Sequence, residues 1–307
     1  MFACIAPACV VKGQDEGTQW AVVAVSDAFM RDEARYGSEC VNQCSMGTLV
    51  QVLERKGYWA RVRTPEPYEG WVNELALAPT RALSAEEQKA TGLYGATLMP
   101  MSSEEAQAYL SEPKLICLSQ KVKVCDSPGG ELVATLLMGN IVRTVKDGYQ
   151  DGWRKVILPD GKEGWCPGRD LVPMQDWEQA EAEEDAATKI EDIIGLAKSF
   201  IGCPYLWGGM SPGHFDCSGL VSFCFRMNGI QLPRDASQQV GCGVEVPVDG
   251  MLPGDLVFFG NNSVAHVAIC IGDKRIIHAS QLVRINSLDP SAPDYYGRKI
   301  LHVRRIL

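Results

Sequence analysis

The chain has 307 residues, with 29 Lys and Arg against 38 Asp and Glu, so its formal net charge is −9. This balance argues against a protein whose main task is to bind nucleic acid, because neutralising phosphates requires a basic face. A hydrophobic content of 46% with 22% charged residues excludes disorder as the main state. No run approaches the roughly 18 apolar residues that span a bilayer, and the length predicts two or three globular domains.

The amino-terminal residues 1–11 are apolar, but they lack a basic segment and are short for a signal sequence. They are either the remnant of a leader or an edge strand. We expect a cytoplasmic protein, with the periplasm or cell envelope as the alternative.

Twelve cysteines are scattered along the chain. No Cys-x-x-Cys pair occurs, and the Cys40-x-x-x-Cys44 spacing has only four histidines elsewhere with which to form a zinc site. The even count permits disulfides, although in a chain of this size buried, reduced cysteine is the commoner outcome. We therefore expect neither a metal nor a cofactor.

An internal repeat becomes visible when a Met-Gly pair and two tryptophans are used as markers. Each copy alternates apolar and polar residues over short runs broken by Gly, Asp and Pro, which predicts small antiparallel strands and a small barrel. The markers are Met46, Trp59 and Trp71 in the first copy and Met138, Trp153 and Trp165 in the second, offset by 92 residues at Met and 94 at Trp.

Short helices are predicted at residues 83–89 and 102–110, because in each a Ser is followed by Glu within three residues. The acidic stretch 175–191 predicts a solvated linking helix, and the run 181–185 within it suggests no further role. This stretch marks the boundary with a distinct carboxy-terminal domain.

The carboxy-terminal domain combines helices with later strands. Residues 190–200 have helical spacing, a Gly/Pro-rich loop follows at 202–209, and residues 216–229 predict a helix that stops at Gly229. A helix followed by antiparallel strands indicates an α+β fold rather than a doubly wound sheet. The expected strands are 255–259, 265–271 and 275–278.

Cys217 stands at the predicted start of a helix, where the helix N-terminus is expected to lower the pKa of its thiol. A thiolate nucleophile needs a base, and the base needs a group that orients it. His266 and His278 flank a predicted hairpin whose turn is 272–274, and their midpoint is residue 272, so the two rings should meet across paired strands. This pattern predicts a Cys-His-His site with His266 as general base and His278 as orienting partner.

The remaining histidines, His214 and His302, have no such geometry and are expected to be surface or packing residues. Cys203, Cys224 and Cys270 lie around the predicted site, either to tune it or only to pack.

Six motifs resemble the NlpC/P60 cysteine peptidases. The resemblance implies a papain-like catalytic domain whose catalytic residues are Cys217, His266 and His278. The motifs are Gly202–Gly209, Phe215–Leu220, Leu232–Gln238, Pro253–Phe259, His266–Ile269 and Ile277–Ser280.

The two repeats resemble bacterial SH3 (SH3b) domains. The arrangement predicts an α+β chain with a first SH3b domain at 1–82, a helical linker at 83–112, a second SH3b domain at 113–175 and the catalytic domain with its linking helix at 176–307. This order resembles the γ-D-glutamyl-L-diamino acid endopeptidases. The resemblance implies hydrolysis of the γ-D-glutamyl–diamino acid bond in murein peptides with a free N-terminal L-Ala, releasing L-Ala-γ-D-Glu.

The same resemblance implies substrate-binding residues beside the nucleophile. Asp216 and Ser218 flank Cys217, and an acidic group there would hold the substrate ammonium. Tyr205 would lie near Cys217 and donate to the oxyanion together with the Cys217 backbone N–H. Ser237, within the motif Leu232–Gln238, is also expected to contact substrate.

Two further substrate-binding residues are expected in the first repeat. Tyr68 occupies the place of the family's cleft-closing tyrosine; the equivalent position in the second copy is Lys162, so Tyr68 is not simply a barrel core residue. The alternative is an aromatic residue in a surface turn. Glu39 resembles a family acidic position near the ammonium.

The leading hypothesis is therefore a thiol protease that acts on murein peptides without a metal. Two alternatives stay open. One is a hydrolase of intact peptidoglycan whose SH3b units bind the wall, and the other is a non-catalytic wall-binding protein. Changing Tyr68 or Glu39 distinguishes the first alternative, because a gating role requires the preference for free N-termini to depend on them.

Overall fold

The structure is a computed structural model that describes residues 17–307. The apolar segment 1–11, with Cys4 and Cys9, lies outside the described residues. Two compact units meet in sequence between Trp177 and Glu178, and each is described by itself. Among the described residues, no helix has the length and apolar character needed to cross a membrane.

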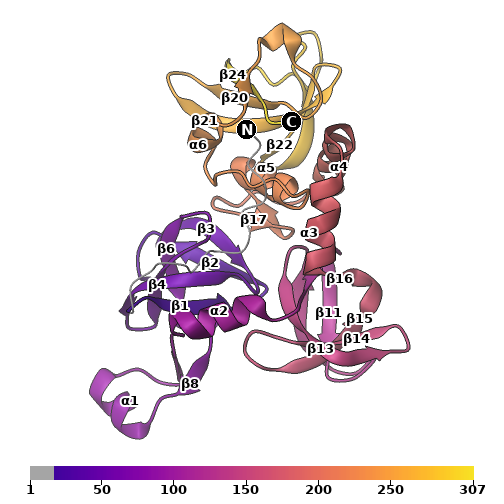
Figure 1. Cartoon of the computed structure of the whole chain (residues 1–307). Coiled ribbons are helices and arrows are strands. Elements are labelled where there is room, and N and C mark those ends of the chain that lie inside the picture. The colour runs from indigo at the N-terminus through magenta and orange to yellow at the C-terminus, as the bar shows by residue number, and fades with distance from the viewer. Residues whose placement is uncertain (1–16) are drawn as a thin grey trace. The chain divides into compact units, whose positions relative to one another are not determined.

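The first unit contains two seven-stranded antiparallel sheets with the same strand order (Figure 1). The first sheet has the order β3-β2-β6-β5-β4-β1-β7 and consists of β1 (Gln19–Val23), β2 (Asp27–Arg31), β3 (Cys40–Ser45), β4 (Leu49–Lys56), β5 (Trp59–Arg63), β6 (Glu69–Asn73) and β7 (Leu77–Ala78). The second has the order β12-β11-β15-β14-β13-β10-β16 and consists of β10 (Lys114–Cys117), β11 (Lys121–Cys125), β12 (Leu132–Leu137), β13 (Ile141–Gln150), β14 (Trp153–Ile157), β15 (Glu163–Pro167) and β16 (Leu171–Pro173). One-turn 3-10 helices, Glu74–Ala76 and Gly168–Asp170, precede the last strand of each.

The tryptophan markers occupy equivalent places in the two sheets. Trp59 and Trp153 begin β5 and β14. Trp71 lies opposite Arg31 in the first sheet, and Trp165 lies opposite Cys125 in the second. Trp165 is 94 residues after Trp71, and Cys125 is 94 residues after Arg31. The repeat predicted from sequence is therefore a repeat of strand order and register.

The expected closed barrels are not found. In each sheet the first and last strands of the order, β3 and β7 or β12 and β16, are not paired with each other. The prediction of two SH3-like barrels is thus not confirmed, whereas the β-rich amino-terminal region is.

Two hydrogen bonds join the two sheets within this unit. The Ile141 amide donates to the carbonyl of Met46 at 2.9 Å, and the Asn140 side-chain amide donates to the carbonyl of Ser26 at 2.9 Å. Met46 is also buried in the core of the second sheet, although it belongs to the first repeat. Gly47, with φ of 86°, follows it and approaches Ile141 closely.

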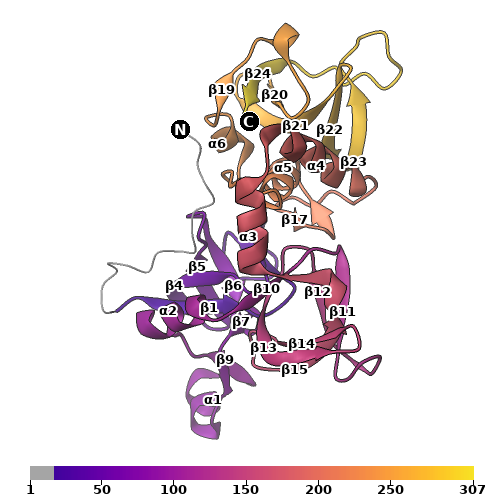
Figure 2. The same ribbon diagram turned by 45° about the vertical axis from the view of Figure 1, so that its right-hand side comes forward.

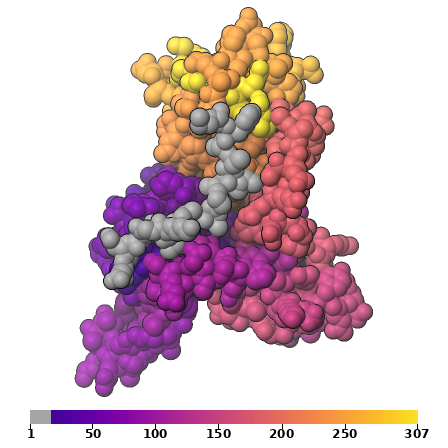
Figure 3. Space-filling model, in the orientation of Figure 1, coloured from indigo at the N-terminus to yellow at the C-terminus, as the bar shows by residue number. Residues whose placement is uncertain are grey.

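Both short helices predicted in this unit are confirmed. They are α1 (Ala85–Thr91) and α2 (Ser103–Ser111), and each begins with a Ser–Glu capping box. Helix α1 lies at the tip of a two-stranded arm, β8 (Thr80–Ala82) and β9 (Ala96–Leu98), in the ribbon view (Figure 1). The same purple segment protrudes in the space-filling view (Figure 3).

The expected single helix over residues 175–191 is wrong. The chain forms α3 (Met174–Glu183) and α4 (Ala186–Ser199), because the Asp185 side chain caps α4 by accepting from the amides of Ala187 and Thr188. The acidic run also has a structural role. Lys189, 8% exposed, donates to the Glu181 carboxylate at 3.1 Å and to the Asn228 carbonyl at 3.2 Å.

The second unit has the expected mixture of helices and an antiparallel sheet. Helix α5 (Cys217–Arg226) lies beside α4 and packs against β21 and β22 of the sheet (Figure 2). All of α5 from Cys217 to Phe225 is buried. The six-stranded sheet has the order β19 (Val244–Glu245), β24 (Ile300–Arg305), β20 (Leu256–Gly260), β21 (Val264–Gly272), β22 (Arg275–Ser280), β23 (Leu282–Ser287), and the remaining elements are β17 (Met210–Ser211), β18 (His214–Phe215), α6 (Ala236–Gln239) and the 3-10 turn Val248–Gly250.

The close approach at Gly47 predicts a position-specific loss of stability. A Cβ at Gly47 would overlap the Ile141 carbonyl and lie 2.7 Å from its Cβ, whereas a Cβ at Gly57, which also has positive φ, meets nothing within 4 Å. Gly47→Ala should therefore lower the free energy of unfolding by about 1–3 kcal/mol more than Gly57→Ala, measured by denaturant unfolding. Equal losses in the two variants would contradict a rigid junction between the sheets.

Candidate active site

Helix α5 begins at Cys217, as the sequence predicted, because Asp216 caps it. The Asp216 carboxylate accepts from the backbone N–H of Gly219 at 2.7 Å, which satisfies one of the free donors of the first turn. The nucleophile candidate is therefore the first residue of a buried helix.

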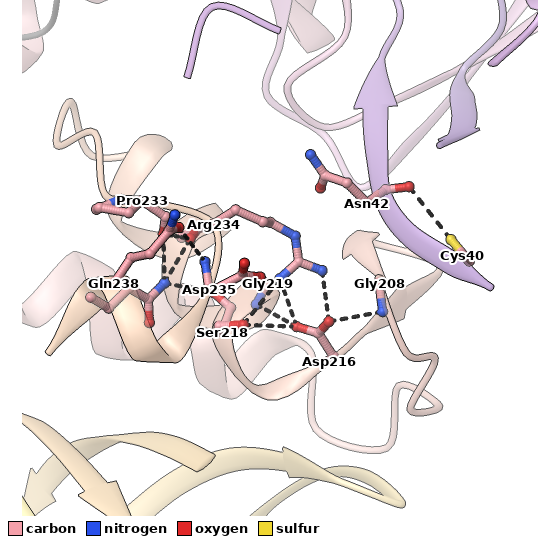
Figure 4. A network of polar contacts seen from close by, with 12 residues as sticks. Cys40, Asn42, Gly208, Asp216, Ser218, Gly219, Pro233, Arg234, Asp235 and Gln238 are labelled. Carbon is pink, nitrogen blue, oxygen red and sulfur yellow. Dashed lines mark hydrogen bonds and ion pairs between the residues drawn. The ribbon is translucent and has the colours of Figure 1, made fainter. Parts of the chain in front are cut away.

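A buried ion pair holds this helix start in place (Figure 4). Arg234 Nη2 donates to Asp216 Oδ2 at 2.6 Å, and Arg234 Nη1 donates to Asp216 Oδ1 at 3.1 Å and to the Ser218 hydroxyl at 3.0 Å. The Gly208 amide donates to the same carboxylate at 2.9 Å. Arg234 and Asp216 are 4% and 6% exposed, so both charges are removed from water.

Arg234 is a functional candidate that the sequence interpretation missed. It lies in the motif Leu232–Gln238, between Pro233 and the short helix α6. Nothing in the residue pattern there distinguishes it from a surface arginine. The available signal was Asp216 itself, since a carboxylate expected to be buried at a helix start needs a cation. With Gly208, Gly219, Ser218 and Arg234 as donors, Asp216 already accepts five hydrogen bonds.

The thiol of Cys217 does not have the lowered pKa that its helix position suggested. Its pKa is raised to about 11, because burial disfavours the thiolate and the neighbouring Asp216 carboxylate repels it. The backbone N–H groups of Val267 and Ser218, with Arg234, oppose this shift without reversing it. The resting nucleophile is a neutral thiol next to the Val267 amide.

The two histidines meet on the predicted hairpin, but not directly opposite each other. The turn residues Asp273 and Lys274 have positive φ, Gly272 faces Arg275, and an irregularity follows before Ile269 faces Ile277. In this register His278 lies opposite residue 268, so His266 is its diagonal neighbour on the same face. The expected symmetry about residue 272 is wrong because the two-residue turn is centred between 273 and 274.

A chain of hydrogen bonds fixes the tautomer of both rings. The Asn286 side-chain amide donates to the Asp294 carbonyl at 2.7 Å, which leaves Asn286 Oδ1 to accept from His278 Nε2 at 2.9 Å. His278 Nδ1 must then accept from His266 Nε2, 2.7 Å away. The remaining lone pair is on His266 Nδ1, which is the nitrogen able to take a proton.

Burial keeps both rings neutral. It lowers the pKa of His266 to about 3, with further contributions from His278 and Arg298. It also lowers the pKa of His278 to about 4, a shift that the hydrogen bond donated by His278 to Asn286 opposes and that Arg284 and Arg298 reinforce. At neutral pH the pair is a hydrogen-bonded base rather than a cation.

The other residues predicted around the nucleophile are distributed unevenly. Tyr205 is half-buried, and burial together with the nearby Cys217 raises the pKa of its phenol. Ser218 is buried and its hydroxyl is bonded to Arg234 and Asp216, whereas Ser237 is exposed on α6. Neither His214, exposed in β18, nor His302, which contacts Glu245 at 3.1 Å, joins the catalytic group.

Glu39 and Tyr68 belong to the other unit, where they lie at the same end of the first sheet. Glu39 is exposed and precedes β3, and Tyr68 precedes β6 and packs partly against the sheet's core. The strands β3 and β6 flank β2, and Arg31 pairs with both Cys40 and Trp71 at this end.

The structure describes ten cysteines, and seven of them are buried. Cys224 and Cys270 pack inside the second unit, and Cys203 is half-buried with its thiol 3.4 Å from the Pro212 carbonyl. Within residues 17–307 no group of three His, Cys, Asp or Glu side chains is arranged to hold a metal ion.

Comparison with known proteins shows the family of this chain. Residues 202–305 match the NlpC/P60 family, and residues 30–77 match the bacterial dipeptidyl-peptidase SH3 domain. A dipeptidyl-peptidase 6 from Lysinibacillus sphaericus is 31% identical over 283 residues, which is 90% of this chain and 94% of the relative. The chain belongs to the NlpC/P60 family, a family of cysteine peptidases that hydrolyse cell-wall material, and it carries an SH3-type domain.

Two Bacillus cereus proteins extend the comparison. A gamma-D-glutamyl-L-lysine dipeptidyl-peptidase is 28% identical over 278 residues, covering 86% of this chain and 74% of the relative. The crystal structure of an NlpC/P60 family protein matches with a TM-score of 0.72 at 23% identity, over 94% of this chain and 99% of that one, and shares the fold. The SH3 match covers residues 30–77, which lie in the first sheet, so an SH3b identity for the second sheet stays a prediction.

The buried Asp216–Arg234 pair predicts a large loss when it is broken. Arg234→Leu leaves a buried, unpaired carboxylate and should lower the free energy of unfolding by about 3–5 kcal/mol. The matched control is Arg275→Leu, because its 2.7 Å pair with Asp294 is about 40% exposed and is worth at most about 1 kcal/mol. The Asp216→Asn/Arg234→Leu variant should be more stable than Arg234→Leu alone; if it is not, the loss does not come from the buried charge.

The neutral histidines predict that acid destabilises the protein from pH 6.5 downward. The unfolded chain protonates each imidazole near pH 6.5, but the pKa values of His266 and His278 in the folded state are about 3 and about 4. The folded state therefore binds fewer protons below pH 6.5, and at pH 5.5 the free energy of unfolding should have fallen by about 1.4 kcal/mol per histidine.

Urea unfolding at pH 7.5, 6.5 and 5.5 measures this dependence. His278→Gln should lose about half of the slope, and His214→Gln should keep all of it because His214 is exposed. Equal slopes for the wild type and His278→Gln would show that the pair is not held neutral by burial.

Proposed function

We propose that the protein is a cysteine peptidase that hydrolyses the γ-D-glutamyl–diamino acid bond of murein peptides with a free N-terminal L-Ala. The observation that carries this proposal is the directed hydrogen-bond chain from Asn286 through His278 to His266, which leaves one basic nitrogen on the strand that contacts Cys217. The name of the Bacillus cereus relative, a gamma-D-glutamyl-L-lysine dipeptidyl-peptidase, supports the choice of bond.

In this proposal the proton moves as the bond forms. Cys217 Sγ attacks the γ-carbonyl carbon while His266 Nδ1 takes the thiol proton, and the carbonyl π-electrons move to the oxygen. The backbone N–H of Cys217 and the Tyr205 hydroxyl stabilise this oxyanion. The intermediate collapses by breaking the C–N bond, and the leaving amine takes the proton from His266.

The second half of the reaction uses the same base. His266 Nδ1 removes a proton from water, and the resulting hydroxide oxygen attacks the thioester carbon. Collapse of that intermediate breaks the C–S bond and returns the proton to the Cys217 sulfur. His278 keeps the His266 ring in its orientation and stabilises its cationic form through the 2.7 Å hydrogen bond.

Because Cys217 and His266 are both neutral at rest, no stable ion pair has to be discharged before attack. The cost of separating charge falls in the transition state, where the thiolate, the imidazolium and the oxyanion are close together. The buried hydrogen-bond chain lowers that cost because its dipoles are already aligned.

The preference for a free amine is assigned to Asp216, Ser218, Ser237, Tyr68 and Glu39. Arg234 already compensates the charge of Asp216, so this carboxylate alone offers an ammonium little net attraction. Glu39 is exposed and takes part in no ion pair among the described residues, so its negative charge is available. We therefore expect the selection to depend on the amino-terminal residues Glu39 and Tyr68 as well as on Asp216.

Mass spectrometry of two peptides tests this function. The protein should release L-Ala-γ-D-Glu from L-Ala-γ-D-Glu-L-Lys and should cleave the N-acetylated peptide about 100-fold more slowly, since acetylation removes the ammonium and adds bulk. Cys217→Ala should abolish cleavage of both. Alkylation of Cys217 in the wild type and a check that each variant is folded serve as controls for intact protein.

Substitutions in the amino-terminal unit separate the proposal from its alternative. Glu39→Gln and Tyr68→Phe should narrow the preference for the free peptide by about 10-fold or more, with cleavage retained. Lys162→Gln, at the repeat position equivalent to Tyr68, is the matched control and should keep the preference. Equal cleavage of both peptides by the wild type would instead favour a hydrolase of intact peptidoglycan.

A further inference from the structure

Tyr296 forms part of the wall around the catalytic histidines and plays no part in the mechanism above. Its ring centroid lies 4.5 Å from that of His278 and 5.6 Å from that of His266. The residue is 9% exposed, yet no hydrogen bond satisfies its buried hydroxyl, and the Ser280 side chain is the polar group that acts on it from nearby. Burial raises the pKa of the phenol, so at neutral pH it is a hydrogen-bond donor.

Two arginines without ion pairs among the described residues act electrostatically on Tyr296. Arg298 places its guanidinium carbon 5.7 Å from the Tyr296 ring centroid. Arg284 lies directly opposite His278 on the neighbouring strand β23, and its Nε is buried without a partner. Within residues 17–307 no carboxylate pairs with either arginine, in contrast to Arg234 and Arg275.

These three residues form a flank of the site that is distinct from the Asp216 flank. The groups that act electrostatically on Tyr205 are Cys217, Asp216 and Arg234, whereas those that act on Tyr296 are Arg298, Cys217 and Arg284. Cys217 alone belongs to both sets. The site therefore contains one compensated pair, Asp216 and Arg234, and two positive charges, Arg284 and Arg298, that no carboxylate among the described residues compensates.

We propose that Tyr296, Arg284 and Arg298, beside the catalytic histidines, form a subsite for a carboxylate on the diamino acid that leaves. The proposal rests on the proposed function, because it assigns the second half of that same substrate. A buried, unpartnered hydroxyl and two unpaired guanidinium groups are all donors, and a carboxylate is the group of a murein peptide that accepts from them. A neutral amide would leave the positive charges uncompensated.

Two carboxylates of such a peptide have this chemistry. One is the α-carboxylate of a tripeptide that ends at the diamino acid. The other is the side-chain carboxylate that diaminopimelate carries and lysine lacks. Three substrates distinguish them: L-Ala-γ-D-Glu-L-Lys, its C-terminal amide, and L-Ala-γ-D-Glu-meso-diaminopimelate.

The test compares kcat/KM of the wild type, Arg298→Gln and Tyr296→Phe on these three peptides. The wild type should prefer a carboxylate by about 10–100-fold. That preference appears either as the lysine peptide over its amide or as the diaminopimelate peptide over the lysine peptide. Arg298→Gln should reduce the preference about 10-fold or more, and Tyr296→Phe, which keeps the ring contacts with both histidines, should reduce it by a smaller factor.

Effects that do not depend on the subsite cancel when kcat/KM is compared as a ratio between two substrates. Arg298 also lowers the pKa of both histidines, but a changed base affects all three peptides alike and cancels in the ratio. Lys299→Gln removes a positive charge from the adjacent residue and should leave the ratio unchanged.

A wild type that cleaves all three peptides within two-fold, or an Arg298→Gln variant that keeps the wild-type ratio, overturns the subsite while leaving the proposed function intact. A wild type that cleaves none of them overturns both.

Discussion

The buried carboxylate of Asp216 is the constraint on which the catalytic end of the second unit depends. It accepts hydrogen bonds from the first turn of α5 at Gly219, from the glycine loop at Gly208 and from Arg234, so one side chain joins three segments of chain. A carboxylate that is 6% exposed cannot exchange these donors for water without a large cost. The position of Cys217, the next residue, follows from that network rather than from the helix alone.

Burial decides the protonation state of the catalytic group as well as its position. It raises the pKa of Cys217 and lowers that of His266, so the same loss of solvent makes both partners neutral. Position and orientation then have to provide what charge does not. The order of hydrogen bonds from Asn286 inward directs the free lone pair of His266, because each ring nitrogen along the chain is already committed as donor or acceptor. The polar chain is thus a device for choosing one tautomer.

Features set by neighbouring residues could be predicted from the sequence, and features set by tertiary burial could not. The tryptophan spacing predicted the repeated strand order, and the pattern around Cys217 predicted its helix start, because both depend on local periodicity and capping. The predicted direction of the Cys217 pKa shift was wrong, because the desolvation of the thiol depends on what packs over the helix. Arg234 and Tyr296 were not singled out for the same reason: their partners come from distant segments. The diagonal placement of His266 and His278 depends on an irregularity in the pairing of β21 with β22, and the residue types there do not predict it.

The charges around Cys217 suggest how the two units divide recognition under the proposed mechanism. Asp216 and Arg234 cancel within the second unit, whereas no carboxylate among the described residues pairs with Arg284 or Arg298, so the surroundings of Tyr296 attract negative groups. A free murein peptide has an ammonium at one end and carboxylates at the other, and its anionic end suits this field without any contribution from the amino-terminal unit. Selecting the ammonium requires a negative charge that the second unit has already neutralised. Glu39, which precedes β3, has a charge that no ion pair among the described residues compensates, so under this proposal the preference for the ammonium would depend on it.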